Sequence, residues 1–228
     1  MGTRRASGGD KRRAASDIRR MTILRRAFLA LSFLLCAGPA FAADKLVVAF
    51  GDSLIAGYRL GPTEGFAPQL EAALRRSGIA ARVHGAGVSG DTTAQGKARL
   101  NWVLTSLKAK PDLVIVELGA NDMLRGLSPK QAESNLDAIL AELRRRGINT
   151  MLAGMIAMPN LGPDYARAFN PIYGRLARKY GVSLYPFFLR GMVGDRRYSI
   201  GDGIHPNKAG VGVIVRGILP PVRRALTR

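Results

Sequence analysis

The chain has 228 residues, which suit a single domain once an N-terminal segment is set aside. Its 35 Lys and Arg against 16 Asp and Glu give a formal net charge of +19, and Cys36 is the only cysteine. Because Cys36 lies in an N-terminal apolar run that we expect to be removed, the mature chain would have no cysteine for a disulfide or a thiolate metal site.

The first 20 residues do not have the composition of a folded segment. They are rich in Arg, Lys, Gly and Ser, and they hold almost no large apolar side chain that could contribute to a core. We interpret residues 1–20 as a disordered segment or as an over-extended start, with Met21 as the true initiator.

Residues 21–42 follow the pattern of a secretory signal peptide. Arg25-Arg26 precedes an apolar run over 27–37, and Ala40-Phe41-Ala42 matches a cleavage site of small residues. The run is too short to span a bilayer. We therefore expect cleavage after Ala42 and a periplasmic or secreted protein. A retained N-terminal anchor and twin-arginine export are the alternatives.

Positive charge remains after this segment is removed. Residues 1–42 carry nine Lys and Arg and two acidic residues, which leaves 26 basic and 14 acidic residues and a net charge of +12. An anionic lipid or lipopolysaccharide surface is therefore a candidate partner, with ordinary solvated surface charge as the alternative. No basic run lies beside an aromatic-rich strand, so no nucleic-acid partner is predicted.

Apolar, β-branched runs alternate with helical patterns along the rest of the chain. The expected strands are Leu46–Phe50, Arg82–His84, Leu113–Leu118, Thr150–Met155 and Val182–Tyr185. The expected helices cover about Phe66–Ser77, Thr92–Leu107, Pro129–Arg146, Tyr165–Tyr180 and Asn207–Leu226, with the pair Pro220-Pro221 breaking the last. This alternation indicates the α/β class: a flavodoxin-like three-layer α/β/α sandwich with a five-stranded parallel sheet, in one domain over 43–228.

Four short polar segments adjoin these elements in an order that places them on one rim of the sheet. They are Gly51-Asp52-Ser53-Leu54, Ser89-Gly90-Asp91-Thr92, Gly119-Ala120-Asn121-Asp122 and Asp202-Gly203-Ile204-His205-Pro206. Sites in open parallel sheets gather at the carboxyl ends of the strands. Together the segments supply a serine, a glycine amide, an asparagine amide and an Asp/His pair, which are the groups that acyl transfer from an ester requires.

These segments carry a resemblance to a known family. The phrases over 51–59, 116–126 and 201–207, with the segment over 89–92, reproduce the four sequence blocks of the GDSL/SGNH hydrolases in order. The chain resembles that family over nearly all of 45–221. It is most similar to the bacterial periplasmic group of multifunctional thioesterases, lysophospholipases and arylesterases. The resemblance implies the SGNH hydrolase fold and a serine hydrolase.

Ser53 is the candidate nucleophile, and a serine hydroxyl needs a base within hydrogen-bond reach. Of the two histidines in the sequence, only His205 has an acid at matching spacing, because Asp202 lies three residues before it. We assign His84 to the surface or to a structural role. A serine after a strand is ordinarily a helix cap, and the three other segments decide in favour of catalysis.

The oxyanion hole is expected to use the backbone N–H groups of Ser53 and Gly90 and the side-chain amide of Asn121. Glycine permits a close backbone approach, and a neutral amide donates a hydrogen bond without adding a competing charge. The acidic residues next to these donors are interpreted as helix caps or anchors of loop amides rather than catalytic acids: Asp52, Asp91 and Asp122.

The segment after the fourth expected strand is a candidate wall for an acyl chain, because Met and aromatic side chains tolerate flexible lipid tails. Ordinary core packing is the alternative. In the family that the chain resembles, the corresponding loop closes over acyl chains. The candidate substrate-binding residues are Met155, Met158, Leu161, Tyr165 and Phe169, with Phe187, Phe188 and Met192 beside them.

We therefore predict a monomeric serine esterase for carboxylic esters and thioesters with short to medium acyl groups, with lysophospholipids and aryl esters in its range. No metal and no nucleotide cofactor is predicted, because the histidines lack metal-ligand spacing and no G-x-G-x-x-G follows the first strand. A carbohydrate acetylesterase on the same fold is an alternative, although Trp102 is the only tryptophan that could stack on a sugar. A non-catalytic envelope lipid-binding protein and a flavin binder are further alternatives.

Overall fold

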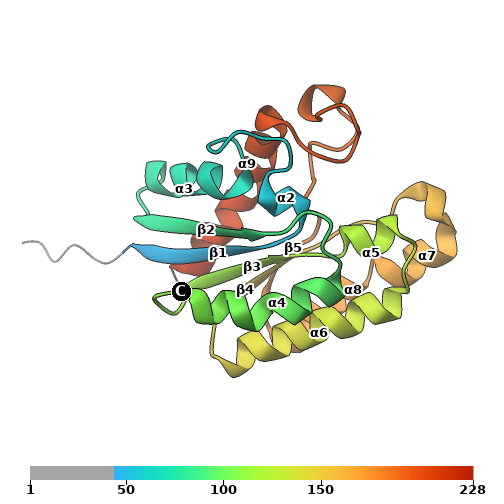
Figure 1. The fold of residues 1–228 in the computed structure, drawn as a ribbon, viewed down its shortest axis with the longest axis horizontal. Helices are drawn as coiled ribbons and strands as arrows, with labels where there is room; N and C mark the ends of the chain where they lie inside the picture. Colours follow the sequence, from blue (N-terminus) through green and yellow to red (C-terminus); the bar gives the residue numbers. More distant parts are fainter. Residues whose placement is uncertain (1–43, 228) are drawn as a thin grey trace, which may run out of the picture. The chain divides into compact units, whose positions relative to one another are not determined.

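A five-stranded parallel sheet runs through residues 44–227, the part of the chain that the computed structural model describes (Figure 1). The signal peptide expected over 21–42 and the segment expected before it, over 1–20, lie outside these residues. The strands have the spatial order β2-β1-β3-β4-β5, and every neighbouring pair is parallel. Their bounds are β1 (Lys45–Gly51), β2 (Ala81–Gly87), β3 (Leu113–Glu117), β4 (Thr150–Ala153) and β5 (Ser183–Tyr185). The predicted α/β class and all five expected strands are confirmed.

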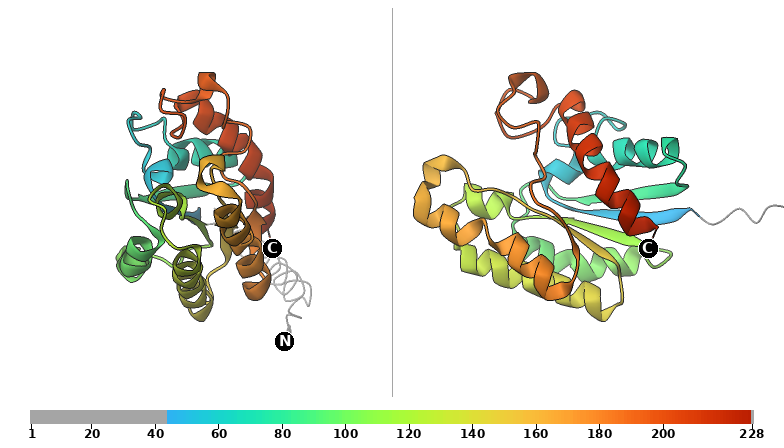
Figure 2. Two further views of the ribbon diagram at one scale, coloured as in Figure 1. Left: turned by 90° about the vertical axis from the view of Figure 1, so that its right-hand side faces the viewer. Right: turned by 180° about the vertical axis from the view of Figure 1, so that it is seen from behind.

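Helices cover both faces of the sheet, as Figures 1 and 2 show. One layer contains α2 (Ser53–Ala56), α3 (Phe66–Arg76) and α9 (Lys208–Leu226). The other contains α4 (Thr93–Ser106), α6 (Pro129–Arg145) and α8 (Ile172–Tyr180). Two further helices, α5 (Ala120–Leu124) and α7 (Gly162–Phe169), and two 3-10 turns, η1 (Pro159–Leu161) and η2 (Arg196–Tyr198), lie in the connections.

The core forms where these layers meet the strands. β1 and β3 are buried over most of their length, as near-continuous apolar runs between two helical layers should be. On α6, four apolar side chains at helical spacing form a buried stripe: Leu136, Ile139, Leu140 and Leu143. Within residues 44–227, no helix combines the length and the apolar character needed to cross a membrane.

The strand register aligns the ends that carry the polar segments. Gly51 at the end of β1 pairs with Gly87 on one side and with Glu117 on the other. The polar segments that follow β1, β2 and β3 therefore all begin at the carboxyl end of the sheet. Residues distant in sequence are brought together along this rim.

Two expectations about helices were wrong. Pro220 and Pro221 do not break the last helix, which continues to Leu226. A proline fits helical φ, and its cost is a missing N–H donor. The buried side chains of Val222 and Leu226, beyond the prolines, offset that loss by packing on the core.

The helix expected over 165–180 is two helices, α7 and α8, separated at Asn170 and Pro171. Pro171 cannot donate to the preceding turn. The side chain of Asn170 instead accepts a hydrogen bond from the backbone N–H of Ala157 at 2.7 Å, which fixes the turn against the segment after β4.

Candidate active site

Ser53, His205 and Asp202 form a continuous hydrogen-bonded chain. The Ser53 Oγ lies 2.9 Å from the Nε2 of His205, and the Nδ1 of His205 lies 2.6 Å from the Oδ2 of Asp202. Ser53 is the first residue of α2, directly after β1, and Asp52 caps that helix by accepting from the N–H of Leu54 at 3.0 Å. The geometry is that of a nucleophile, a base and an acid that orients the base.

The loop before α9 is folded so that one carboxylate fixes His205 twice. An isolated bridge joins Ser199 to Pro206 and closes the loop. Asp202 Oδ1 accepts from the backbone N–H groups of Ile204 (3.0 Å) and His205 (2.9 Å), while its other oxygen faces the imidazole. The sharp reversal requires left-handed backbone at two positions occupied by glycine: Gly201 (φ 107°) and Gly203 (φ 76°).

These contacts determine the charge of Asp202. Partial burial acts to raise its pKa, but hydrogen bonds from the His205 ring and from two backbone N–H groups outweigh burial and lower the pKa to about 2. Asp202 is therefore ionised throughout the neutral range and holds the Nδ1–H tautomer of His205, which leaves Nε2 free to accept the proton of Ser53.

The donors expected to form the oxyanion hole are two backbone N–H groups and one side-chain amide. Within residues 44–227, the backbone N–H groups of Ser53 and Gly90 take no hydrogen-bond partner. Gly90 has a φ of 86°, a conformation that a side chain would strain. The Nδ2 of Asn121 donates to Asp52 Oδ2 and to the carbonyl of Asp91, both at 3.0 Å. Because both partners accept, they fix the nitrogen end of the amide toward Asp52 and Asp91, and both of its N–H groups are used in these bonds.

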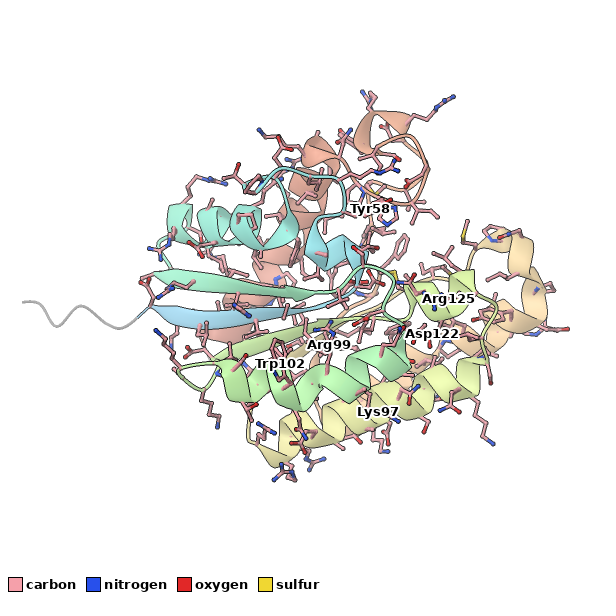
Figure 3. The ribbon with its side chains drawn as sticks, viewed as in Figure 1. Tyr58, Lys97, Arg99, Trp102, Asp122 and Arg125 are labelled. Atoms are coloured by element: carbon pink, nitrogen blue, oxygen red, sulfur yellow. The ribbon has the colours of Figure 1, made fainter. Side chains whose placement is uncertain are left out.

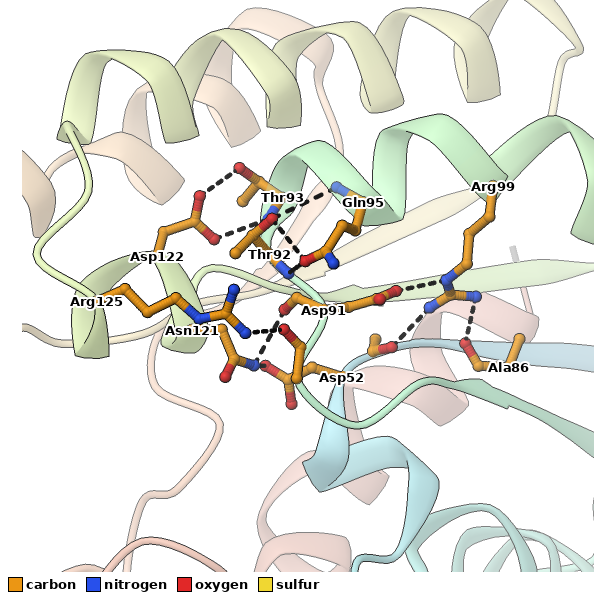
Figure 4. A network of polar contacts seen from close by, with 12 residues as sticks. Asp52, Ala86, Asp91, Thr92, Thr93, Gln95, Arg99, Asn121, Asp122 and Arg125 are labelled. Atoms are coloured by element: carbon orange, nitrogen blue, oxygen red, sulfur yellow. Dashed lines mark hydrogen bonds and ion pairs between the residues drawn. The ribbon is translucent and has the colours of Figure 1, made fainter.

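The segment that carries Gly90 is held by two arginines (Figure 4). Arg99 donates to the Asp91 carboxylate at 2.6 Å, and its other nitrogens donate to the carbonyls of Gly51 (2.7 Å) and Ala86 (3.0 Å). Arg125 Nη2 donates to the Gly90 carbonyl at 2.7 Å. The ends of β1 and β2 are thereby tied to the donors of the site.

The three acidic residues that were expected to cap helices or anchor amides differ in role. Asp52 caps α2, and Asp122 accepts from the backbone N–H of Thr93 at 2.7 Å at the start of α4. Asp91 does neither: its carboxylate is the partner of Arg99. Arg99 stands eight residues after Asp91, and neither residue belongs to a spacing pattern that the sequence analysis used.

The second histidine and a nearby tyrosine occupy different places relative to the site. His84 is exposed on the edge strand β2, away from the triad, in agreement with the surface role assigned to it. Tyr58, which was not singled out from the sequence, packs on the His205 imidazole with ring centroids 4.7 Å apart. Residues 44–227 contain no group of three or more His, Cys, Asp or Glu side chains that could hold a metal ion.

An apolar pocket of about 360 Å³ opens beside Ser53. Ser53, Asn121 and His205 lie in its wall. Of the candidate acyl-binding residues, Met155, Met158 and Phe187 line it. The lining residues not singled out for this role from the sequence are Leu54, Ala120, Met123, Leu124, Ile156, Ala157, Pro159, Leu189, Val193, Gly203 and Ile204.

The other candidates lie elsewhere. Phe169 is fully buried between Tyr165 and Tyr173, and Tyr165 turns its hydroxyl to the carbonyl of Leu127. Phe188 is buried edge-on against Phe66 in the core. Leu161 and Met192 also pack in or against the core and do not line the pocket.

Comparison with known proteins gives one family. Residues 49–213 match the model of the GDSL-like Lipase/Acylhydrolase family. The esterase TesA of Pseudomonas aeruginosa is 38% identical over 196 residues, which cover 86% of this chain and 96% of that protein. The thioesterase 1/protease 1/lysophospholipase L1 of Escherichia coli K12 is 38% identical over 74% of this chain and 78% of its own length.

A solved structure extends the likeness to three dimensions. The crystal structure of AlinE4, described as an esterase of the SGNH-hydrolase family, is 49% identical to this chain. The two superpose with a TM-score of 0.70 over 82% of this chain and 99% of the other. At this level of identity, the likeness concerns both the fold and the family.

Proposed function

The chain belongs to the GDSL-like lipase/acylhydrolase family of ester-hydrolysing enzymes, and from that premise we propose that it cleaves short to medium acyl esters and thioesters through Ser53, His205 and Asp202. The observation that carries the proposal is the hydrogen-bonded chain from Ser53 to Asp202 at the wall of an apolar pocket. The pocket gives the acyl group a place to lie while its carbonyl carbon faces the hydroxyl.

In the acylation step, Ser53 Oγ attacks the carbonyl carbon as His205 Nε2 takes its proton. Asp202 stabilises the resulting imidazolium through Nδ1–H. The negative charge that develops on the carbonyl oxygen is stabilised by the backbone N–H groups of Ser53 and Gly90 and by one N–H of Asn121 Nδ2, which turns from the Asp91 carbonyl while the other stays on Asp52. Collapse of this intermediate breaks the bond to the alcohol or thiol, which leaves with the proton from His205.

Deacylation repeats these roles with water as the nucleophile. His205 accepts a proton from the water as it attacks the acyl carbon on Ser53, and it returns that proton to Ser53 Oγ when the acid is released. The same oxyanion donors serve both steps because the carbonyl oxygen does not move between them.

The pocket supports an acyl rather than a sugar substrate. Its wall is made mostly of aliphatic and Met side chains, among them Met123, Met155 and Met158, which adapt to a flexible chain. Trp102 is 72% exposed on α4 and is not among the residues that line the pocket. The wall therefore offers no tryptophan on which a sugar ring could stack, which disfavours the carbohydrate acetylesterase alternative.

A panel of p-nitrophenyl esters from acetate to palmitate, with acyl thioesters of the same lengths, tests the substrate class. We expect turnover of both ester types with a maximum at short to medium chains, because a pocket of about 360 Å³ limits the length of chain that it encloses. A rate measured for acetate alone would point to an acetylesterase. A folded protein inactive on every member of the panel would refute the proposal.

We also propose that the enzyme works at an anionic lipid surface. Four apolar side chains that line the pocket are exposed by 37–51% at its mouth: Leu124, Ile156, Met158 and Val193. Tyr58, itself 37% exposed, lies beside them on His205. In sequence, Arg59 follows Tyr58, Arg125 follows Leu124 and Arg196 lies three residues after Val193. Figure 3 places Tyr58 and Arg125 at the strand ends, apart from Trp102 on α4. An apolar rim with arginines suits lipid tails beneath anionic headgroups.

The double variant Arg59→Gln with Arg196→Gln is expected to bind phosphatidylglycerol vesicles less tightly than the wild type, because each arginine near such a surface contributes about 1 kcal/mol. Co-sedimentation with vesicles measures the loss. The matched control, Lys108→Gln with Arg144→Gln, removes the same charge near the ends of α4 and α6, away from the rim. Equal binding by the two double variants would show that net charge alone attracts the protein.

Export belongs to the same proposal. An enzyme for envelope lipids needs a leader such as that expected over 21–42, and the chain after it contains no thiol that an oxidising compartment would modify. An N-terminal sequence starting at Ala43 in protein recovered from the periplasm, together with a monomer mass in solution, is the expected result. A cytoplasmic protein with residues 21–42 intact would contradict export.

A further inference from the structure

Glu117, at the end of β3, is a fully buried carboxyl group that the reaction does not use. It pairs in register with Gly51, the residue before Asp52 and Ser53. A Cβ added to Gly51 would lie 2.6 Å from Glu117 Oε2, so the carboxyl group rests directly against that strand end. Neither of its oxygens has a hydrogen-bond partner within residues 44–227. A buried, unpartnered carboxyl group at this position calls for an explanation.

The neighbour that acts on Glu117 is the Asp52 carboxyl group, which is buried as well. Asp52 already accepts from the Leu54 N–H through Oδ1 and from Asn121 Nδ2 through Oδ2. Two ionised carboxylates can only accept, so they cannot bond to each other unless one of them holds a proton. A proton held by one of the two carboxyl groups would supply the hydrogen bond that Glu117 otherwise lacks.

Both charges cannot be present in this environment at neutral pH. Burial raises the pKa of Glu117 well above its ordinary value, and the charge of Asp52 adds to the rise. Burial also raises the pKa of Asp52, to about 6, although Leu54, Asn121 and His205 lower it. The pair therefore keeps one proton at pH 7, and Glu117 is the group that holds it.

The other polar groups around Glu117 and Asp52 do not change the assignment of the proton to Glu117. The hydroxyl of Tyr173 is used on the carbonyl of Leu118, so it does not donate to Glu117. The guanidinium of Arg99 donates to the Gly51 carbonyl and is matched by an acidic partner of its own. The ionisable groups that face the pair are thus Asp91, His205, Arg99 and Tyr173.

We propose that Glu117 is a positioning residue of the oxyanion hole: it donates its proton to the Asp52 carboxylate, and Asp52 in turn holds the nitrogen of the Asn121 amide toward the substrate. The inference rests on the proposed ester hydrolysis. A carboxylate selects Nδ2 over Oδ1 because it only accepts. If Asp52 carried the proton instead, it could donate to Oδ1, and the reversed amide would present an oxygen to the developing oxyanion.

Glu117→Met and Glu117→Gln separate this role from simple packing. Methionine fills a similar volume without a donor, and we expect kcat for a soluble acetate ester to fall by about 10²-fold with little change in KM, as when one oxyanion donor is lost. Glutamine keeps an N–H donor to Asp52, and we expect its kcat to stay within a few-fold of the wild type. Equal kcat for the wild type and both variants would overturn the proposal.

A double-mutant cycle tests the route through Asn121. We expect the combination of Glu117→Met with Asn121→Ala to be no slower than Asn121→Ala alone, because both remove the same donor. Multiplicative losses would mean that Glu117 acts by another route. Labelling of Ser53 by a phosphonate ester separates the two proposals: a protein that is not labelled at Ser53 fails the proposed function, whereas one labelled normally but unaffected by Glu117→Met fails only this inference.

Two readouts remain if the Met variant does not fold. Infrared spectroscopy of the wild type at pH 7 should show the carbonyl stretch of a protonated carboxyl group, and that band should be missing from Glu117→Gln. The activity of the wild type should decline at alkaline pH, as Glu117 ionises beside Asp52, and that decline should be absent from the Gln variant. A band or a decline shared by both proteins would refute the assignment of the proton.

Discussion

Replacing Ser53 with Ala is expected to lower kcat for ester hydrolysis by about 10⁶-fold, the scale of loss when a triad nucleophile is removed. Among residues 44–227, the Ser53 hydroxyl is the only hydrogen-bond partner of His205 Nε2, so the variant has no nucleophile that the base can activate. What rate remains would come from water attacking a carbonyl that is still bound in the oxyanion hole. Hydrolysis of p-nitrophenyl butyrate in single turnovers measures the loss.

Two controls show whether the loss of activity is specific to the Ser53 hydroxyl. Ser106→Ala removes a hydroxyl that donates to the Val103 carbonyl at the end of α4, far from the site, and should leave kcat unchanged. Mass spectrometry after a phosphonate ester should show one adduct on the wild type and on Ser106→Ala, and none on Ser53→Ala. Activity or an adduct that survives in Ser53→Ala would place the nucleophile elsewhere.

Much of the fold could be predicted because its strands are unambiguous in the sequence. β3 is a run of apolar, mostly β-branched residues that ends in Glu117, and such a run between two helical patterns suits only a buried parallel strand. The two wrong predictions about helices both concern prolines, whose effect depends on where in a helix they stand. Pro171 stands at the start of α8, where a missing N–H donor costs little, whereas Pro220 and Pro221 lie inside α9, which continues to Leu226.

Short helices were missed for a different reason. α2 has four residues and α5 has five, too few to show a period of 3.6, and both begin directly at strand ends. They matter because they carry Ser53 and Asn121. The sequence placed these residues after strands and so on one rim, but it could not show that each opens a helix.

The candidate catalytic residues could be predicted from the sequence more completely than the residues that line the pocket. The triad and oxyanion residues stand in short motifs, whereas the pocket depends on how separate loops pack. Val193 and Ile156 line it from segments without any motif, while Phe169 was proposed because it is aromatic and follows β4. The Asp91–Arg99 pair and the Glu117–Asp52 contact are likewise tertiary, and no spacing rule points to them.

Replacing Asp202 with Asn is expected to lower kcat by about 10⁴-fold with little change in KM, because it reverses the tautomer of His205. The Asp202 Oδ1 accepts from two backbone N–H groups, and an asparagine oxygen would keep those bonds. Its nitrogen would then face His205 Nδ1 as a donor, in place of Oδ2, which accepts. The imidazole would have to carry its proton on Nε2, where it can no longer take one from Ser53.

The matched control and the pH dependence separate this explanation from a general disturbance of the loop. Asp195→Asn alters an exposed acid that caps η2 in the same loop and should leave kcat unchanged. Because the folded pKa of Asp202 is lowered to about 2, its contribution to stability is present above the unfolded value near 3.8 and is lost as the pH falls toward 2. The difference in Tm between the wild type and Asp202→Asn should therefore be constant above pH 5 and shrink below pH 4. A loss of activity in Asp195→Asn equal to that in Asp202→Asn, or a Tm difference independent of pH, would mean that the loop, rather than the tautomer, is what Asp202 maintains.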